Sequence, residues 1–158
     1  MNGAHLHLIF NHLPIVFPIV ALLVLIGGFL FKSAVIKRVA LAIFVAGSIA
    51  ALPATLTGDG AEEVVENYAG ISEALMHEHE EIAETFALLS YVLGVFALIG
   101  LWANWKKKSF SNYLAVTVLI FSLVVLFFAQ QAGTSGGEIR HEEIRANAAT
   151  VAPEGDDD

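Results

Sequence analysis

The stretch LPIVFPIVALLVLIGGFLF, from Leu13 to Phe31, decides the fold because it contains nineteen consecutive residues without a charge. A helix of that length, rising about 1.5 Å per residue, crosses a hydrocarbon layer about 30 Å thick. The rest of the chain agrees, since 56% of its 158 residues are hydrophobic, 15% are charged and the mean hydropathy is +0.69. This composition lies outside that of ordinary soluble domains and predicts a membrane protein.

Three more runs without a charged residue follow, at residues 39–57, 86–105 and 114–132. Within lipid, only helices and closed barrels satisfy every backbone hydrogen-bonding group, and these runs are too long for barrel strands. Small residues in the second run, such as Gly47 and Ser48, permit close contact between helices. We therefore predict an all-α membrane protein that folds as an antiparallel four-helix transmembrane bundle.

The remaining segments divide the chain into a bundle and a tail. Residues 1–145 are expected to form the bundle, with an acidic outer loop at 58–85 and short outer-face helices in this loop and in the C-terminal segment. Gly133-Thr-Ser-Gly-Gly137 is expected to end the fourth transmembrane helix. Residues 146–158, which end in Pro-Glu-Gly-Asp-Asp-Asp, are typical of a flexible acidic tail.

The charges predict how the bundle is oriented. Six of the eight Lys and Arg residues lie in two short connections, at 32–38 and 106–108, whereas residues 58–85 hold nine carboxylates and no Lys or Arg. Short basic connections stay in the cytoplasm. We therefore expect a multi-pass protein of the bacterial inner membrane, with both termini and the acidic loop in the periplasm. The residues before Leu13 lack Lys and Arg, which argues against a signal peptide.

This topology places all six histidines on the outer side. Two of them, His77 and His79, are about 200° apart on a helix and cannot both face the bundle. Glutamates follow His77 at positions i+3 and i+4, whereas Ile82 and Ala83 follow His79 at the same spacing. We expect His79 to point inward and His77 to lie on a solvated acidic face.

His12 is the second candidate for an inward-facing imidazole. It shares a helix face with Val16 and Ile19, and a weak internal repeat of the two hairpins pairs it with His79. In an up-and-down bundle the first and third helices lie diagonally, so their inward histidines would face each other. Two opposed imidazoles are the arrangement that holds haem b in a helical bundle.

Two kinds of cofactor site are compatible with these residues. In a b-type cytochrome, His12 and His79 would be axial ligands and Arg140 or Arg145 would pair with haem propionates, while a second haem would use His7 and His141. In a non-haem site, a Zn, Cu or Fe ion would be bound, since imidazole suits all three and the chain has no cysteine. The ligands would come from His5, His7, His12, His79 and His141, with Glu63 or Glu80.

A third hypothesis is a cofactor-free structural subunit whose acidic loop docks a partner. The chain contains no P-loop, dinucleotide fingerprint or recognisable catalytic triad, so we expect no independent catalytic activity. A net charge of −8 argues against nucleic acid. The expected partners are the lipid bilayer and either partner subunits or periplasmic redox proteins.

Four strings in the chain also resemble a known family. They are His5-Leu-His-Leu-Ile-Phe-Asn-His-Leu-Pro14, Leu56-Thr-Gly-Asp-Gly-Ala-Glu-Glu63, His79-Glu-Glu and Gly136-Gly-Glu-Ile-Arg-His-Glu-Glu-Ile144. They look like those of the small four-span bacterial membrane proteins grouped as domain of unknown function 2231. The resemblance implies the four-span fold but no specific activity, and relatives fused to Rieske or c-type cytochrome modules would imply a respiratory setting.

Overall fold

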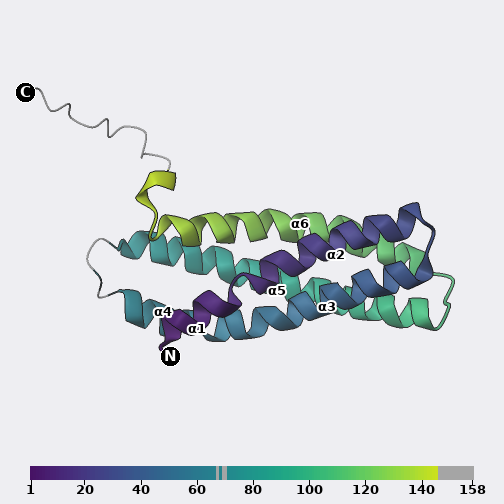
Figure 1. Ribbon diagram of the computed structural model, residues 1–158, viewed down its shortest axis with the longest axis horizontal. Coiled ribbons are helices and arrows are strands. Elements are labelled where there is room, and N and C mark those ends of the chain that lie inside the picture. Colours follow the sequence, from purple (N-terminus) through teal and green to yellow (C-terminus); the bar gives the residue numbers. More distant parts are fainter. Residues whose placement is uncertain (67, 69–70, 146–158) are drawn as a thin grey trace, which may run out of the picture.

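The computed structural model describes residues 1–66, 68 and 71–145. Within this part of the chain every regular element is helical, and four helical stretches are long and apolar enough to cross a membrane. Figure 1 shows the long helices side by side, which confirms the predicted four-helix transmembrane bundle. The elements are α1 (Gly3–Phe10), α2 (Leu13–Leu30), α3 (Ala34–Leu56), α4 (Gly58–Val65), α5 (Glu73–Trp105), α6 (Ser111–Glu138) and the 3₁₀ turn η1 (Glu142–Ile144).

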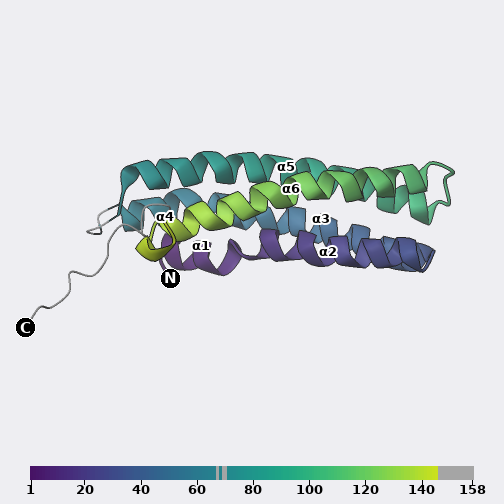
Figure 2. The same cartoon turned by 90° about the horizontal axis from the view of Figure 1, so that it is seen from above.

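The four long helices form a ring in the order α2, α3, α5, α6. Helix α3 packs against both α2 and α5, while α6 packs against both α5 and α2. As a result α2 lies diagonally across the bundle from α5, as Figure 2 shows. The short helices α1 and α4 pack against each other at one end of the bundle, beside the end of α3.

The core consists largely of small and medium-sized residues, whereas many large aliphatic side chains face outward. Ala21, Ala40 and Ala97 are fully buried, while Leu23 and Leu88 are more than 60% exposed. Lipid solvates Leu and Ile well, so helices in a membrane gain most by bringing small residues together. The bundle therefore buries close helix contacts and leaves an apolar surface for the bilayer.

Two of these contacts confirm the predicted role of the small residues on α3. A Cβ atom on Gly94 of α5 would overlap the side chain of Ser48, and a Cβ atom on Gly47 would lie 2.9 Å from Cβ of Phe17 on α2. Neither contact leaves room for a larger residue. Gly47 and Ser48 thus fix how closely α3 approaches its two neighbours.

The helices continue beyond the charge-free runs. Helix α5 has 33 residues, or about 50 Å at 1.5 Å per residue, so its glutamate-rich beginning extends beyond a hydrocarbon layer of about 30 Å. Helix α6 runs through Gly136 and Gly137 to Glu138, and the prediction that residues 133–137 end this helix is wrong. Packing overrides the low helix propensity of glycine, because Gly136 leaves room for a side chain of α5.

The two hairpin turns at the opposite end have the same backbone structure. Lys32 and Lys107 have φ values of 49° and 51°, the left-handed conformation that commonly ends a helix. In the first turn Ser33 N donates to Gly28 O at 3.0 Å, and in the second Lys108 N donates to Ala103 O at 2.9 Å. These are equivalent bonds of the Schellman motif, so the two halves of the chain do share a repeated structural feature.

Buried polar residues join three helices near these turns. Lys37 Nζ donates to Asn112 Oδ1 on α6, and Arg38 Nε donates to Asn104 Oδ1 on α5, both at 2.8 Å. The Lys37 side chain also lies over the Phe29 ring, 4.6 Å from its centroid. Lys37 and Arg38 thus form hydrogen bonds between helices at the basic end. The lysines of the turns themselves are exposed.

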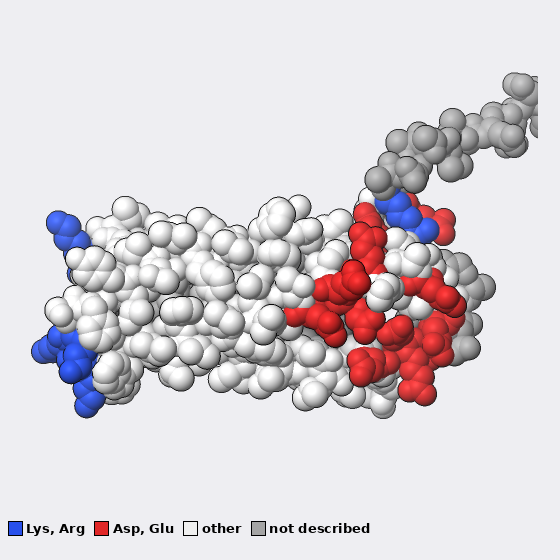
Figure 3. All heavy atoms as spheres, turned by 180° about the vertical axis from the view of Figure 1, so that it is seen from behind, with Lys and Arg blue, Asp and Glu red and all other residues white. Residues whose placement is uncertain are grey.

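The charged side chains separate to the two ends of the bundle, as Figure 3 shows. Lys and Arg of the two turns lie at one end, whereas Asp and Glu gather at the other end around α4 and the beginning of α5. Arg140 and Arg145 lie at this acidic end as well. The wide apolar band between the two ends is what a multi-pass membrane protein presents to lipid.

Candidate cofactor site: a histidine pair at the acidic end

His79 lies near the start of α5 with its ring against α6. Its Nδ1 is 3.0 Å from Oγ of Ser135, and the Ser135 hydroxyl donates to the carbonyl of Ala132 at 3.3 Å. A Cβ atom on Gly136 would lie 2.9 Å from Cε1 of the ring, so only glycine leaves this space free. The prediction that His79 points into the bundle is confirmed.

His7, on α1, is held in the same way at the end of α3. Its Nδ1 is 3.1 Å from the carbonyl oxygen of Ala54 and 3.3 Å from Oγ1 of Thr57. This carbonyl belongs to the last turn of α3, where carbonyl groups lack partners within the helix. Helix α1 can approach because Gly3 meets the backbone of Gly60 on α4, and a Cβ atom on Gly3 would overlap the Gly60 carbonyl.

The two histidines therefore occupy equivalent positions in the two halves of the chain. Each contacts a hydroxyl group through Nδ1, and each hydroxyl donates to the carbonyl of the alanine three residues earlier. The Thr57 Oγ1 to Ala54 O distance is 3.2 Å, and the Ser135 Oγ to Ala132 O distance is 3.3 Å. The repeat was predicted to relate His12 to His79, but these contacts relate His7 to His79.

His12 is exposed and does not face the bundle, so its predicted orientation is wrong. Its Nδ1 is 3.3 Å from the Leu8 carbonyl oxygen, within its own helical segment. The neighbours that suggested burial, Val16 and Ile19, are themselves 48% and 45% exposed. In a membrane helix an apolar stripe can face lipid, and α2 instead buries Pro14, Pro18, Ala21, Leu25 and Gly28.

The hydrogen bonds fix which ring nitrogen is available on each histidine. A carbonyl oxygen can only accept, so Nδ1 of His7 carries a hydrogen. The Ser135 hydroxyl gives its own hydrogen to the Ala132 carbonyl, so Nδ1 of His79 is the donor to Ser135 Oγ. In the neutral imidazole Nε2 then holds a free electron pair. His7 has an electrostatic effect on His79, so the two rings lie in the same region at the acidic end. The site thus offers two Nε2 donors, on α1 and α5, whose rings are oriented by second partners, as is usual for metal-bound histidine.

Within the described residues, His5, His77 and Glu80 lie apart from this pair. His5 is exposed on α1. His77 is exposed and lies 3.6 Å from Glu80 and 3.4 Å from Glu81, which confirms its predicted place on the acidic face. Glu80 therefore contacts His77 rather than the His7–His79 pair, and Glu63 is exposed on α4. Among the described residues, no three His, Asp or Glu side chains converge in a way that could hold a metal ion.

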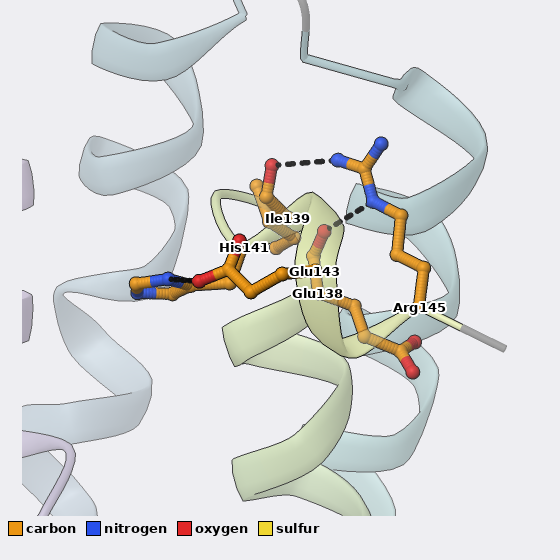
Figure 4. Close-up of polar contacts among 5 residues, drawn as sticks. All are labelled: Glu138, Ile139, His141, Glu143 and Arg145. Atoms are coloured by element: carbon orange, nitrogen blue, oxygen red, sulfur yellow. Dashed lines mark hydrogen bonds and ion pairs between the residues drawn. The ribbon is translucent and has the colours of Figure 1, made fainter. Parts of the chain in front are cut away.

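The C-terminal candidates form a separate cluster, drawn in Figure 4. His141 Nδ1 is 2.8 Å from Glu143 Oε1. A hydrogen bond to its own backbone N–H, together with the bond to His141, lowers the pKa of the Glu143 carboxyl group. Arg145 folds back and donates from Nε to the Glu138 carbonyl at 2.8 Å and from an Nη atom to the Ile139 carbonyl at 3.3 Å.

Arg145 therefore caps the end of α6 and is already engaged, whereas Arg140 is exposed and lies over the Tyr68 ring, 5.7 Å from its centroid. Of the two arginines predicted to bind haem propionates, only Arg140 keeps its guanidinium group accessible. His141 pairs with an exposed carboxylate of its own segment. The structure thus separates His141 from the histidines of α1 and α5 in its contacts.

The residues that position the pair were not predicted from the sequence. They are Ala54, Thr57, Ala132, Ser135 and Gly136. A signal was present, because each hydroxyl residue follows an alanine by three positions and lies at the start of a glycine-containing segment. Because α6 was predicted to end at residues 133–137, the sequence did not show that Ala132 and Ser135 lie beside a histidine.

Comparison with known proteins gave no match to this chain in a scan of family models, in a search of curated proteins or in a search of solved structures. The resemblance to domain of unknown function 2231 stays a prediction.

Proposed function

We propose that this protein is a haem-binding electron-transfer or accessory subunit of a membrane, in which His7 and His79 would hold the haem. The observation that carries the proposal is the pair of equivalent imidazoles, each in contact through Nδ1 with a hydroxyl group that donates to an alanine carbonyl, and each presenting a free Nε2. This replaces the predicted pair of His12 and His79.

The number of ligands favours haem over a metal ion. A structural zinc ion takes four protein ligands and a catalytic one takes three, and the described residues bring no third His, Asp or Glu to this pair. Haem iron needs only two axial ligands from the protein. When bound, haem would supply one-electron transfer, while His7 and His79 hold it and the hydroxyls of Thr57 and Ser135 keep the two rings oriented.

Two more features support a redox role at the acidic end. The exposed guanidinium group of Arg140 is suited to a carboxylate such as a propionate. The surrounding glutamates would attract a positively charged partner protein and steer its approach. A periplasmic redox protein with a basic surface is therefore the proposed partner class.

The most direct test of the cofactor is the absorption spectrum of the purified full-length protein, oxidised and dithionite-reduced, with haem, iron, zinc and copper measured on the same sample. The proposal predicts a Soret band, sharp α and β bands on reduction, and about one haem per chain. Stoichiometric zinc or copper without haem would replace it by a metal-ion site. Protein that lacks both after supply of haem during expression would favour the structural role.

We also propose that the basic turns face the cytoplasm and the histidine pair faces the periplasm of a bacterial inner membrane. The chain has no cysteine, so single cysteines can report this orientation. Ser109 is exposed in the second basic turn, and Ser72 lies at the start of α5. In intact spheroplasts an impermeant thiol reagent should label Ser72→Cys and spare Ser109→Cys, and the reverse pattern would invert the proposed topology.

A further inference from the structure

A shallow, open groove lies along the basic end of α5, and all five residues that line it come from this one helix. It is independent of the histidine pair, which lies at the opposite end of the same helix. Its lining residues recur every three or four positions and therefore share one helix face. They are Leu98, Leu101, Trp102, Trp105 and Lys106.

The chemistry of the groove changes in a fixed order along the helix. Leu98 lies deepest in the apolar band and is 55% exposed, so the protein itself does not cover it. Trp102 and Trp105 follow at 50% and 71% exposure, at the level where tryptophan marks a membrane interface. Lys106 closes the series. This order of aliphatic, aromatic and cationic groups matches the acyl chain, ester region and phosphate of a phospholipid.

The charge at this end favours an anionic occupant. Lys106 is followed by two more exposed lysines, and Lys108 places its Nζ over the Trp102 ring, 5.7 Å from the centroid. No Asp or Glu occurs between residues 85 and 137, so the parts of α5 and α6 near the basic end supply no counter-charge. Lys37 and Arg38, by contrast, donate to Asn112 and Asn104.

We propose that this groove binds one anionic phospholipid, with an acyl chain along Leu98 and Leu101 and the phosphate at Lys106. Trp102 and Trp105 form the wall between the two parts of the lipid. A zwitterionic lipid carries a compensating cation on its headgroup and gains less from the three lysines. The site therefore selects lipids by net charge, and it stabilises the turn that joins α5 to α6.

The test measures lipid retention by the full-length protein in native mass spectrometry, with phosphatidylglycerol and phosphatidylcholine of equal chain length as competing probes. Lys106→Gln should weaken phosphatidylglycerol binding about fivefold and leave phosphatidylcholine unchanged. Trp105→Ala should weaken both lipids, because it removes part of the wall. Lys32→Gln is the matched control, since Lys32 is an exposed lysine of the other basic turn and does not line this groove.

Three results would overturn the proposal. Equal loss of phosphatidylglycerol in Lys106→Gln and Lys32→Gln would reduce the effect to general charge attraction. Equal binding of the two lipids by the unmodified protein would remove the charge selection. A dimer that persists without lipid and dissociates in Trp105→Ala would assign the groove to a second copy of this chain. Circular dichroism of each variant checks that the helices are retained.

Discussion

The His79 ring occupies the space that a side chain at position 136 would fill, because a Cβ atom on Gly136 would lie 2.9 Å from Cε1 of this ring. The ring could not keep its bond to Ser135 against such an atom. Glycine is therefore required at this position of α6. It allows the backbone of α6 to lie against His79, the candidate ligand on α5 of the same hairpin.

Gly136→Ala should therefore empty the site as effectively as loss of the imidazole. The helix itself should tolerate the change, since alanine is favoured over glycine in a helix interior by about 1 kcal/mol. Haem per protein is the measurement. Gly133→Ala is the matched control, because a Cβ atom there would meet only Ile15 Cδ1 at an ordinary 3.7 Å. Equal haem content in the two variants would contradict the proposed placement of His79.

The hydroxyl groups of Thr57 and Ser135 should tune the site without binding the iron. Thr57→Val and Ser135→Ala each remove one partner of a histidine Nδ1, and such changes typically lower metal affinity by about 10- to 100-fold. Haem titration and the midpoint potential report the effect. Thr57→Ser keeps the hydroxyl and should restore both values, whereas a purely steric role for Thr57 would leave Thr57→Ser as impaired as Thr57→Val.

Ser90→Ala tests a buried hydroxyl in the bundle. Ser90 is 5% exposed, its Oγ has no hydrogen-bond partner among the described residues, and it lines a cavity of about 10 Å³. Removal of an unpaired buried polar group is neutral or stabilising. The thermal midpoint in detergent should stay constant or rise.

Ser122→Ala is the comparison for that change, because the fully buried Ser122 donates to the Leu119 carbonyl at 2.7 Å. Loss of this bond should destabilise the bundle by about 1 kcal/mol. If Ser90→Ala lowers the midpoint as much as Ser122→Ala, a water molecule bound in the cavity satisfies the Ser90 hydroxyl.

Lys107→Gly should stabilise the second turn. Lys107 has a φ of 51°, a conformation that costs residues other than glycine about 1 kcal/mol. Unfolding in mixed micelles should show a gain of that size. Lys108→Gly, next to it in the same turn but without a positive φ, should give no gain, and equal stabilisation by both variants would assign the effect to charge rather than to backbone conformation.

The fold was predictable because charge-free runs report directly on the hydrocarbon layer. Outside the hydrocarbon layer charged residues are allowed, so the lack of charge no longer marks a helix. The sequence therefore did not reveal that α5 begins at Glu73 or that α6 continues to Glu138. Those extensions are decided by packing between helices. They also carry the site, since His79 and Ser135 both lie in them.

The orientation of His79 was predictable but that of His12 was not, and the difference has a physical cause. The glutamates beside His77 mark the solvent-exposed face of α5, so His79, on the opposite face, is expected to pack against the bundle. On α2 every face is apolar, and Val16 and Ile19 face lipid as readily as they would face a core. His7 was a weaker candidate because its partners, Ala54 and Thr57, are some fifty residues away in the chain.

The measurement that tests the histidine pair most directly is haem content and the reduced absorption spectrum in three variants purified in parallel, His7→Ala, His79→Ala and His12→Ala. All should keep the helical circular dichroism of the unmodified protein. We predict loss of haem or of the sharp α band in His7→Ala and in His79→Ala, and an unchanged spectrum in His12→Ala, whose ring is exposed. Loss in His12→Ala with a normal spectrum in His7→Ala would contradict the assignment of the pair.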